Sequence, residues 1–207
     1  MPRWHSPADT ELPFMLIGAA MSCQRPPAAR RHADGFTLLD LIIAVTILGV
    51  LMGIVIPTLK DAVARTHAAS TRSAITTTLF DALRHATVLG REIVVCPASA
   101  SQCAGGTDWS PGWIAFIDTD GNRLHSPDEQ IVRQQEKLPA GVRLHGTIGR
   151  QRIVYQPNGG NGGSNITFTL CDRRGPKHAQ ALILSNGGRL RSERAAPAAA
   201  ATCASGL

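Results

Sequence analysis

Two arginines near the end of the chain are spaced so that they could bind phosphate groups. They lie in the segment Ser185-Asn-Gly-Gly-Arg-Leu-Arg191. Asn186-Gly187 suits a tight hairpin turn. If residues 188–192 form the returning strand, Arg189 and Arg191 project from one face, about 7 Å apart, and the leucine between them from the other. This spacing matches successive phosphates on a nucleic-acid strand, and a guanidinium can grip a phosphate through two hydrogen bonds. The alternative is an edge strand whose exposed arginines deter aggregation.

The charge distribution is uneven along the chain. The whole chain has a net charge of +6. Residues 58–141 contain eight Lys and Arg against nine Asp and Glu, whereas residues 142–207 contain nine against two. The basic excess therefore lies in the last third, where Arg173, Arg174, Lys177 and Arg194 could extend the arginine pair. Such an excess is typical of nucleic-acid binding, and equally of a solvated basic surface.

The acidic segment from Asp118 to Glu129 invites comparison with a calcium loop. Asp118, Asp120 and Glu129 occupy the first, third and twelfth positions of an EF-hand pattern, but the sixth position is Arg123 instead of glycine. The flanking residues are typical of strands, not helices. We therefore predict a polar turn with side-chain-to-backbone hydrogen bonds and no metal ligands.

Other chemistries find no support in the sequence. The segment 157–165 is rich in glycine but lacks the Lys-Ser/Thr end of a phosphate-binding loop, so we expect a mobile loop. No histidine pair has ligand spacing, and no nucleophile can be matched with a base. Trp109 and Trp113 could stack on bases, although Trp113 lies in an apolar run that favours the core. We predict a non-enzymatic protein without a cofactor.

A long apolar segment precedes the domain that carries these residues. From Phe36 it runs for 21 residues with one charge, Asp40, and as a helix would be about 30 Å long, enough to cross a bilayer. A cleaved secretory signal and a plain single-span anchor are the alternatives. Arg25, Arg30 and Arg31 precede the segment, so the positive-inside rule predicts that the C-terminal domain is exported.

The cysteines are consistent with export. Four of the five follow the apolar segment, and in an oxidising compartment they can form two disulfides. Three pairings are possible. We prefer Cys96–Cys103 and Cys171–Cys203, because neighbours in sequence close the smaller loops.

The remaining sequence predicts an α+β fold. Residues 60–89 contain no Pro or Gly, and one apolar face recurs at helical spacing before Gly90 stops the helix. Short β runs separated by Gly- and Pro-containing turns follow from residue 91, which predicts antiparallel sheets. The Ala-rich tail 195–202 is predicted to be an irregular segment that a disulfide of Cys203 holds to the domain. The predicted apolar helix face consists of Ile75, Leu79, Ala82, Ala86 and Leu89. The predicted strands are 93–96, 113–117, 131–133, 142–144, 153–155, 166–170 and 181–184.

The start of the apolar segment resembles type IV pilins and pseudopilins. The resemblance implies that prepilin peptidase cuts after Gly35, that the new first residue Phe36 is N-methylated, and that Asp40 pairs with a neighbouring subunit's free amine during assembly. A proline such as Pro57 often kinks the span in this family. The usual acid is Glu, and the leader is longer than in type IVa pilins. These boundaries give a leader 1–35, a membrane and assembly segment 36–57, a second helical half 58–90, and an exported β-rich domain 91–207.

The β-rich domain resembles the FimT/GspH family of minor pilins and pseudopilins. The Trp113–Asn122 stretch and the late cysteines carry this resemblance. It implies a pilin-like α+β fold, an inner-membrane protein with a periplasmic domain that becomes extracellular in a pilus, and other pilins or pseudopilins as partners. In the FimT branch a Gly-Arg-x-Arg motif binds DNA for natural transformation, and Gly188-Arg189-Leu190-Arg191 matches it. The alternative is a GspH-like minor pseudopilin of type II secretion.

Overall fold

The computed structural model describes residues 35–99 and 102–207. The chain divides into two compact units between Ala44 and Val45. A single helix, α1 (Leu38–Leu89), runs through this boundary. The predicted leader lies outside the described residues except for Gly35.

The first turn of α1 is capped by its own side chains. The hydroxyl of Thr37 donates to Oδ2 of Asp40 at 2.7 Å, and the Asp40 N–H donates to the Thr37 hydroxyl at 3.3 Å. The two side chains thus satisfy backbone donors that a helix start leaves without partners, as in a capping box. Asp40 therefore has a structural role in addition to any role in assembly.

The apolar first part of α1 needs surroundings that the described residues do not supply. Every large apolar side chain from Phe36 to Leu59 is exposed. Within the described part of the chain, α1 is the helix long and apolar enough to cross a membrane. The helix continues across Pro57, the position where the pilin resemblance implied a kink, and the Thr58 hydroxyl donates to the Val55 carbonyl at 2.8 Å.

The second part of α1 buries the predicted face in the domain. Ile75, Leu79, Ala82 and Ala86 are buried, and α1 ends at Leu89, before Gly90 in the left-handed conformation. Leu89 itself was predicted to be buried and is exposed, although Ala86 in the same last turn is fully buried.

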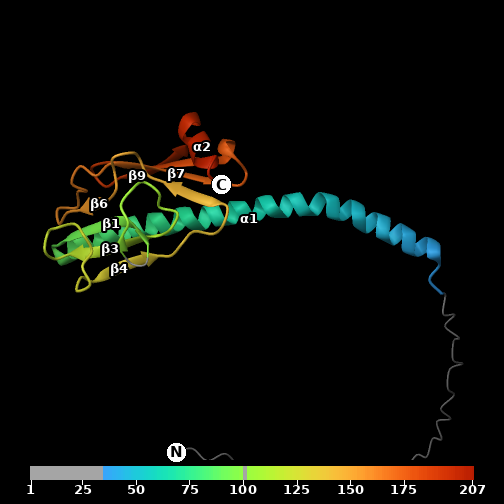
Figure 1. Ribbon diagram of the computed structural model, residues 1–207, viewed down its shortest axis with the longest axis horizontal. Coiled ribbons are helices and arrows are strands. Elements are labelled where there is room, and N and C mark those ends of the chain that lie inside the picture. The colour runs from blue at the N-terminus through green and yellow to red at the C-terminus, as the bar shows by residue number, and fades with distance from the viewer. Residues whose placement is uncertain (1–34, 100–101) are drawn as a thin grey trace, which may run out of the picture. The chain divides into compact units, whose positions relative to one another are not determined.

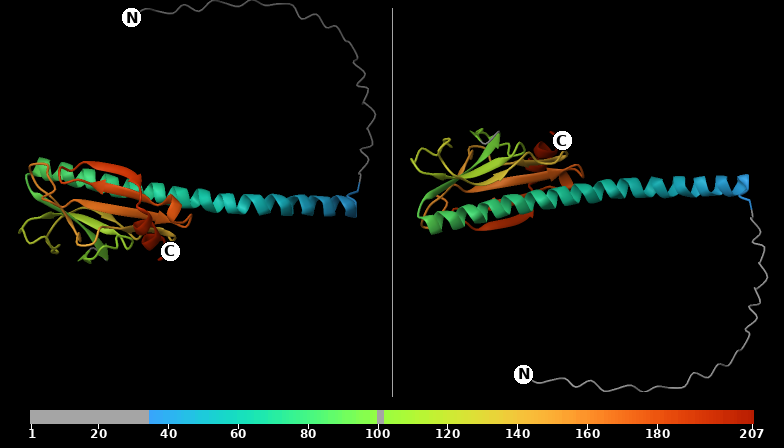
Figure 2. Two further views of the ribbon diagram at one scale, coloured as in Figure 1. Left: turned by 90° about the horizontal axis from the view of Figure 1, so that it is seen from above. Right: turned by 90° about the horizontal axis from the view of Figure 1, so that it is seen from below.

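Two antiparallel sheets pack on this part of α1 (Figures 1 and 2). The first has the order β2-β1-β3-β4, with β6 also paired to β1, and the second has the order β5-β7-β8-β9. Their bounds are β1 Glu92–Ser99, β2 Gln102–Cys103, β3 Trp113–Asp118, β4 Ile131–Gln135 and β6 Ile153–Tyr155, and β5 Val142–His145, β7 Ile166–Asp172, β8 Gln180–Leu184 and β9 Leu190–Arg194. The α+β prediction is confirmed, with a long helix against antiparallel sheets.

One core joins the helix to both sheets. Ile75 and Leu79 from α1, Trp113 from β3 and Phe168 from β7 belong to the same buried cluster. The Trp113 indole N–H donates to the Thr78 hydroxyl of α1 at 3.0 Å, so its one polar atom is satisfied inside the core. The predicted core position of Trp113 is confirmed.

The outer face of the second sheet is closed by a helix that the sequence analysis missed. The tail predicted to be irregular forms α2 (Pro197–Ala204), whose alanines favour helix and whose proline occupies the first turn. The structure contains both preferred disulfides, Cys96–Cys103 and Cys171–Cys203. The second bridge joins α2 to β7, as the prediction of a tied tail required. A short 3-10 helix, η1 (Pro176–His178), lies between β7 and β8.

Candidate nucleic-acid interface

The arginine pair lies on a hairpin between β8 and β9. Ser185 and Arg189 close the turn, with the Ser185 N–H donating to the Arg189 carbonyl at 3.0 Å. The residue in the left-handed conformation is Gly188, with φ 76°, and the strand resumes only at Leu190. The predicted tight turn is present, since the Gly188 N–H donates to the Ser185 carbonyl at 3.0 Å with Asn186 and Gly187 between them, but Gly188 adds a third loop residue. A three-residue loop ending in left-handed glycine is the other common hairpin connection.

The two arginines point away from the core, as their spacing predicted. Leu190 is opposite Leu184 and packs against the main core, whereas Arg191 is opposite Ile183, on the face that points away from α1. Arg189 lies one residue before β9 and bonds to Ser185 across the turn, so alternation predicts that its side chain lies on the same face as that of Arg191; both residues are exposed. Within the described part of the chain neither guanidinium forms an ion pair, so both remain available to an anion.

The glycine-rich segment 157–165 anchors this hairpin. The side-chain amide of Asn161 donates to the Ser185 carbonyl at 2.7 Å, and the Asn165 N–H donates to Oδ1 of Asn186 at 3.1 Å. Asn161 is fully buried. We expected a mobile loop. The structure instead places a buried amide under the turn, a contact between residues 24 positions apart that no local sequence pattern indicates.

Arg174 is already committed to a carboxylate. It makes two hydrogen bonds to Asp172, at 2.9 and 2.6 Å, and the two side chains are only 11% and 2% exposed. Burial alone would raise the pKa of Asp172, but the hydrogen bonds and charge of Arg174 hold it below the ordinary value. Arg174 thus stabilises the end of β7 and is not a free cation.

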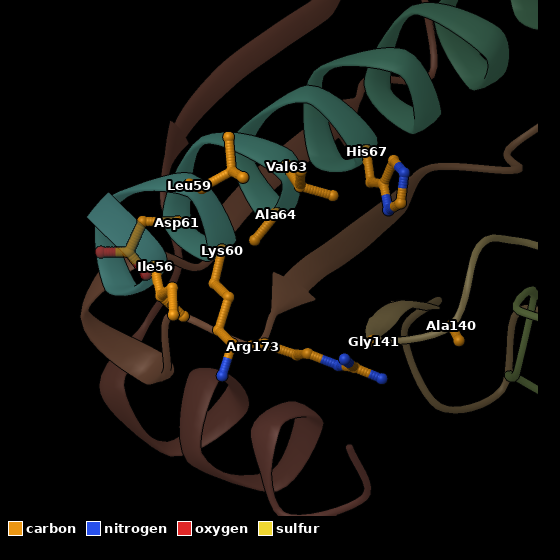
Figure 3. Close-up of a pocket in the computed structure, with 10 residues that line it drawn as sticks. All are labelled: Ile56, Leu59, Lys60, Asp61, Val63, Ala64, His67, Ala140, Gly141 and Arg173. Atoms are coloured by element: carbon orange, nitrogen blue, oxygen red, sulfur yellow. The ribbon is translucent and has the colours of Figure 1, made fainter. Parts of the chain in front are cut away.

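Arg173 lies elsewhere in the domain. It lines a cavity of about 590 Å³ beside the Ile56–His67 part of α1, and its side chain runs toward Gly141 (Figure 3). A side chain on Gly141 would occupy the space that Arg173 takes.

Lys177 and Arg194 come together at the end of β9 opposite to the hairpin. Both line a groove of about 700 Å³ between η1 and α2. Arg194 pairs with Gln180, which places it on the other face of the sheet from Arg191. From Arg189 to Arg194 the strand extends about 17 Å. The structure therefore brings Arg189 and Arg191 together and separates the other four basic residues from them.

The acidic loop is organised by backbone donors. Oxygens of Asp118, Asp120 and Glu129 lie within 4.8 Å of one another. Asp118 accepts hydrogen bonds from Gly121 and Arg123, and Glu129 accepts them from the backbone of Thr119 and Ser126. Burial, together with the charge of Glu129, raises the pKa of Asp118. The geometry is that of the predicted polar turn, and we assign no metal to it.

The second tryptophan suggested for base stacking is inaccessible. Trp109 is fully buried and packs edge-on against Phe168, with the ring centroids 4.9 Å apart. It therefore belongs to the core and cannot stack on a nucleic-acid base in this fold.

Comparison with protein families covers the domain and the first part of the helix. A family described as type II transport protein GspH matches residues 74–188, and the prokaryotic N-terminal methylation motif matches residues 30–56. The chain belongs to the GspH family. The two matches together make it a pilin or pseudopilin, a structural class that prepilin peptidase processes. The GspH match ends at Gly188, so Arg189 and Arg191 lie beyond it.

Individual relatives extend this similarity. The pilin-like protein PilA1 of Thermus thermophilus is 28% identical over 166 residues, which are 77% of this chain and 97% of PilA1. Among solved structures, the type IV minor pilin FimU of Pseudomonas aeruginosa is 17% identical, with a TM-score of 0.49 over 66% of this chain and 92% of FimU. The minor pseudopilin EpsH of the Vibrio cholerae type 2 secretion system is 14% identical, with a TM-score of 0.44 over 63% of this chain and 96% of EpsH.

Proposed function

We propose that this pilin-like protein is a minor type IV pilin whose exported domain binds DNA through Arg189 and Arg191, for uptake in natural transformation. The observation that carries the proposal is the hairpin: two exposed arginines at the start of an edge strand, without carboxylate partners among the described residues, beside a turn held by a buried amide. Gly188 supports the pair by adopting the left-handed conformation that the turn needs.

The chemistry of the pair defines the binding mode. Arginine contacts to phosphate position a protein on DNA without reading its sequence. We therefore expect weak sequence preference. Two contacts are few, so the affinity of one subunit should be micromolar or weaker, on the order of ordinary non-specific binding. Several subunits in one filament would raise the effective affinity by multivalency.

A salt-titrated binding assay tests the proposal. Full-length protein in detergent micelles is titrated into labelled DNA, and the affinity of wild type should fall with salt by a slope of about −0.9 for each phosphate contact on duplex. Arg189→Ala/Arg191→Ala should reduce binding at least tenfold, an estimate of about 1.4 kcal/mol or more, and leave the fold unchanged. Arg84→Ala, an exposed arginine on α1, is the control. Equal binding by wild type and the double variant would refute the site.

The second candidate function is a minor pseudopilin of type II secretion. The description of the matching family favours it. This reading predicts protein partners only, so wild type would bind no DNA even at low salt. Neighbouring genes for a pilus or for secretion would separate the two assignments independently.

Processing and orientation complete the proposal. We propose cleavage between Gly35 and Phe36, N-methylation of Phe36, pairing of Asp40 with a neighbouring subunit, and a periplasmic domain anchored in the inner membrane. Mass spectrometry of the membrane-extracted protein should find a mature chain that begins with methylated Phe36, and Gly35→Ala should leave the leader attached. A different start would contradict the proposed cleavage site.

A further inference from the structure

A groove between α1 and β9 lies beside the arginine pair. Its volume is about 410 Å³. The strand β9 is the last in its sheet and runs next to α1 (Figure 2). Arg191 starts on the outer face but also lines the groove, because it stands on the edge strand and its long side chain can reach over the edge. The groove is therefore continuous with the proposed DNA contact.

The groove is lined by groups suited to a phosphate backbone. Arg72 contributes a second guanidinium from α1, and the described residues that line the groove include no carboxylate. Arg72 is exposed and donates a hydrogen bond of 3.4 Å to the neutral Gln180, and it forms no ion pair with another described residue. Four hydroxyl side chains line the groove, three on α1 and one on β9: Ser73, Thr76, Thr77 and Ser192. Arginine and hydroxyl side chains are the usual protein donors to phosphate oxygens.

The free edge of β9 adds backbone donors. Ser185 and Arg189 form a hydrogen-bonded pair at the hairpin end. In an antiparallel pair, bonded and non-bonded positions alternate. The N–H groups of Leu190 and Ser192 therefore point away from β8, toward the groove side. Such backbone amides are additional donors for phosphate.

One aromatic side chain marks the hairpin end of the groove. Phe80 is 58% exposed although it lies in the packed half of α1. Phe80 and Arg72 are eight residues apart on the helix, about 12 Å along its axis. A sugar or a base could cover the Phe80 ring while phosphates contact the arginines.

The geometry points to this groove as the binding site for the sugar–phosphate backbone of one nucleic-acid strand, with Arg72 as a third phosphate-binding arginine. This inference rests on the proposed function. No local sequence pattern indicates Arg72, because only the folded chain brings α1 beside β9. Charge complementarity selects the occupant: two arginines, four hydroxyl side chains and the edge of β9 line the groove, and no carboxylate does among the residues that the structure describes.

The test measures the salt dependence of binding, because a structural role of Arg72 would not change it. Full-length protein in detergent micelles is titrated with labelled duplex and, separately, with single-stranded DNA. Arg72→Gln should lower affinity about threefold to tenfold and reduce the magnitude of the salt slope by about 0.9 on duplex and about 0.7 on a single strand. Arg72→Lys should restore the slope. Gln180→Ala removes the hydrogen bond but keeps the charge, and should bind as wild type.

Further measurements distinguish the groove proposal from the hairpin proposal, and binding of duplex from binding of single-stranded DNA. Arg84→Gln, on the same helix but outside the groove, should bind as wild type. If Arg72→Gln weakens the binding of both DNAs, the groove accepts the sugar–phosphate backbone of a duplex as well as that of a single strand. If it weakens the binding of single-stranded DNA alone, the groove accepts only an unpaired strand. If Arg72→Gln keeps the wild-type affinity and slope while Arg189→Ala/Arg191→Ala loses binding, the groove assignment is wrong and the proposed function stands. If wild type binds neither DNA, both fail.

Discussion

The two ends of the β5-β7-β8-β9 sheet use arginine in opposite ways. At the η1 end, Arg174 is buried against Asp172 and both charges are neutralised within the fold. At the hairpin end, Arg191 is exposed, without a carboxylate partner in the described residues. A buried pair fixes local structure, because removing one partner leaves an uncompensated charge. An exposed and unpaired arginine contributes little to stability but remains available to phosphate.

This contrast separates stability from binding within one sheet. Changes at the η1 end should lower stability and leave DNA affinity unchanged, whereas changes at the hairpin should do the reverse. The structural reason is distance, since about 17 Å of strand separates Arg189 from Arg194. Each variant should therefore be measured both for unfolding free energy and for DNA binding.

The largest expected effect comes from the bridge that holds α2 at the η1 end. Cys171–Cys203 closes a sequence separation of 32 residues, and Cys96–Cys103 one of only 7. Chain-entropy estimates give a loss of about 3.7 kcal/mol for Cys171→Ala/Cys203→Ala and about 2.4 kcal/mol for Cys96→Ala/Cys103→Ala. Denaturant unfolding should show this order. DNA affinity of the folded protein should not change, and a large loss of affinity would show that the two ends are coupled.

The second largest loss of stability is expected from breaking the Asp172–Arg174 ion pair. Asp172→Asn should lower the unfolding free energy by about 3 kcal/mol, because Arg174 would keep a buried charge without its partner. Asp108→Asn is the control, since Asp108 pairs with Arg143 at 3.4 Å but is 42% exposed. A pair that exposed should contribute less than about 1 kcal/mol. Equal losses for the two variants would contradict the contrast between buried and exposed arginines.

The same pair predicts a pH dependence. Asp172 has a pKa held below its ordinary value of 3.8 in the folded protein. Its contribution to stability is therefore complete above the unfolded pKa and is lost as pH falls through the folded pKa. Unfolding measured from about pH 5 downward should show a steeper loss of stability in wild type than in Asp172→Asn.

What the sequence could predict depended on whether the signal was local. Helical spacing identified the buried positions from Ile75 to Ala86, and alternation placed Arg191 on the opposite face of the strand from Leu190. The prediction was wrong for Leu89, because periodicity alone does not say which positions on the apolar face are covered. It was wrong for α2, because alanines beside a cysteine were read as a tail. Asn161 under Ser185 and Arg72 beside Arg191 are long-range contacts that only the fold creates.

A smaller effect is expected from the amide that supports the hairpin. Asn161→Ala removes the hydrogen bond to the Ser185 carbonyl and should cost about 1–2 kcal/mol of stability, because a fully buried side chain and its hydrogen bond are lost, although the carbonyl keeps the Gly188 N–H as a donor. DNA affinity should fall about threefold, because the turn no longer fixes Arg189. Asn158→Ala is the control, since its exposed side chain accepts a hydrogen bond from the Gly160 N–H of its own loop and does not contact the hairpin turn as Asn161 does. If both variants bind DNA as wild type, Asn161 does not position the arginines.

The smallest effect concerns the basic residues at the η1 end, and salt decides their role. Lys177 and Arg194 line one groove there and are exposed, so Lys177→Ala/Arg194→Ala should change stability by less than about 0.5 kcal/mol. Their separation from the hairpin exceeds the screening length of about 8 Å at physiological ionic strength, but not the length of about 30 Å at 0.01 M salt.

These two cations should therefore act on DNA held at the hairpin only at low salt. Binding curves for wild type and Lys177→Ala/Arg194→Ala should coincide near physiological ionic strength, and the variant should bind more weakly near 0.01 M. If the residues instead contact phosphates directly, counterion release requires a salt slope reduced by about 0.9 per contact on duplex across the whole titration. That result would extend the interface along the full length of β9 and end the contrast between the two ends of the sheet.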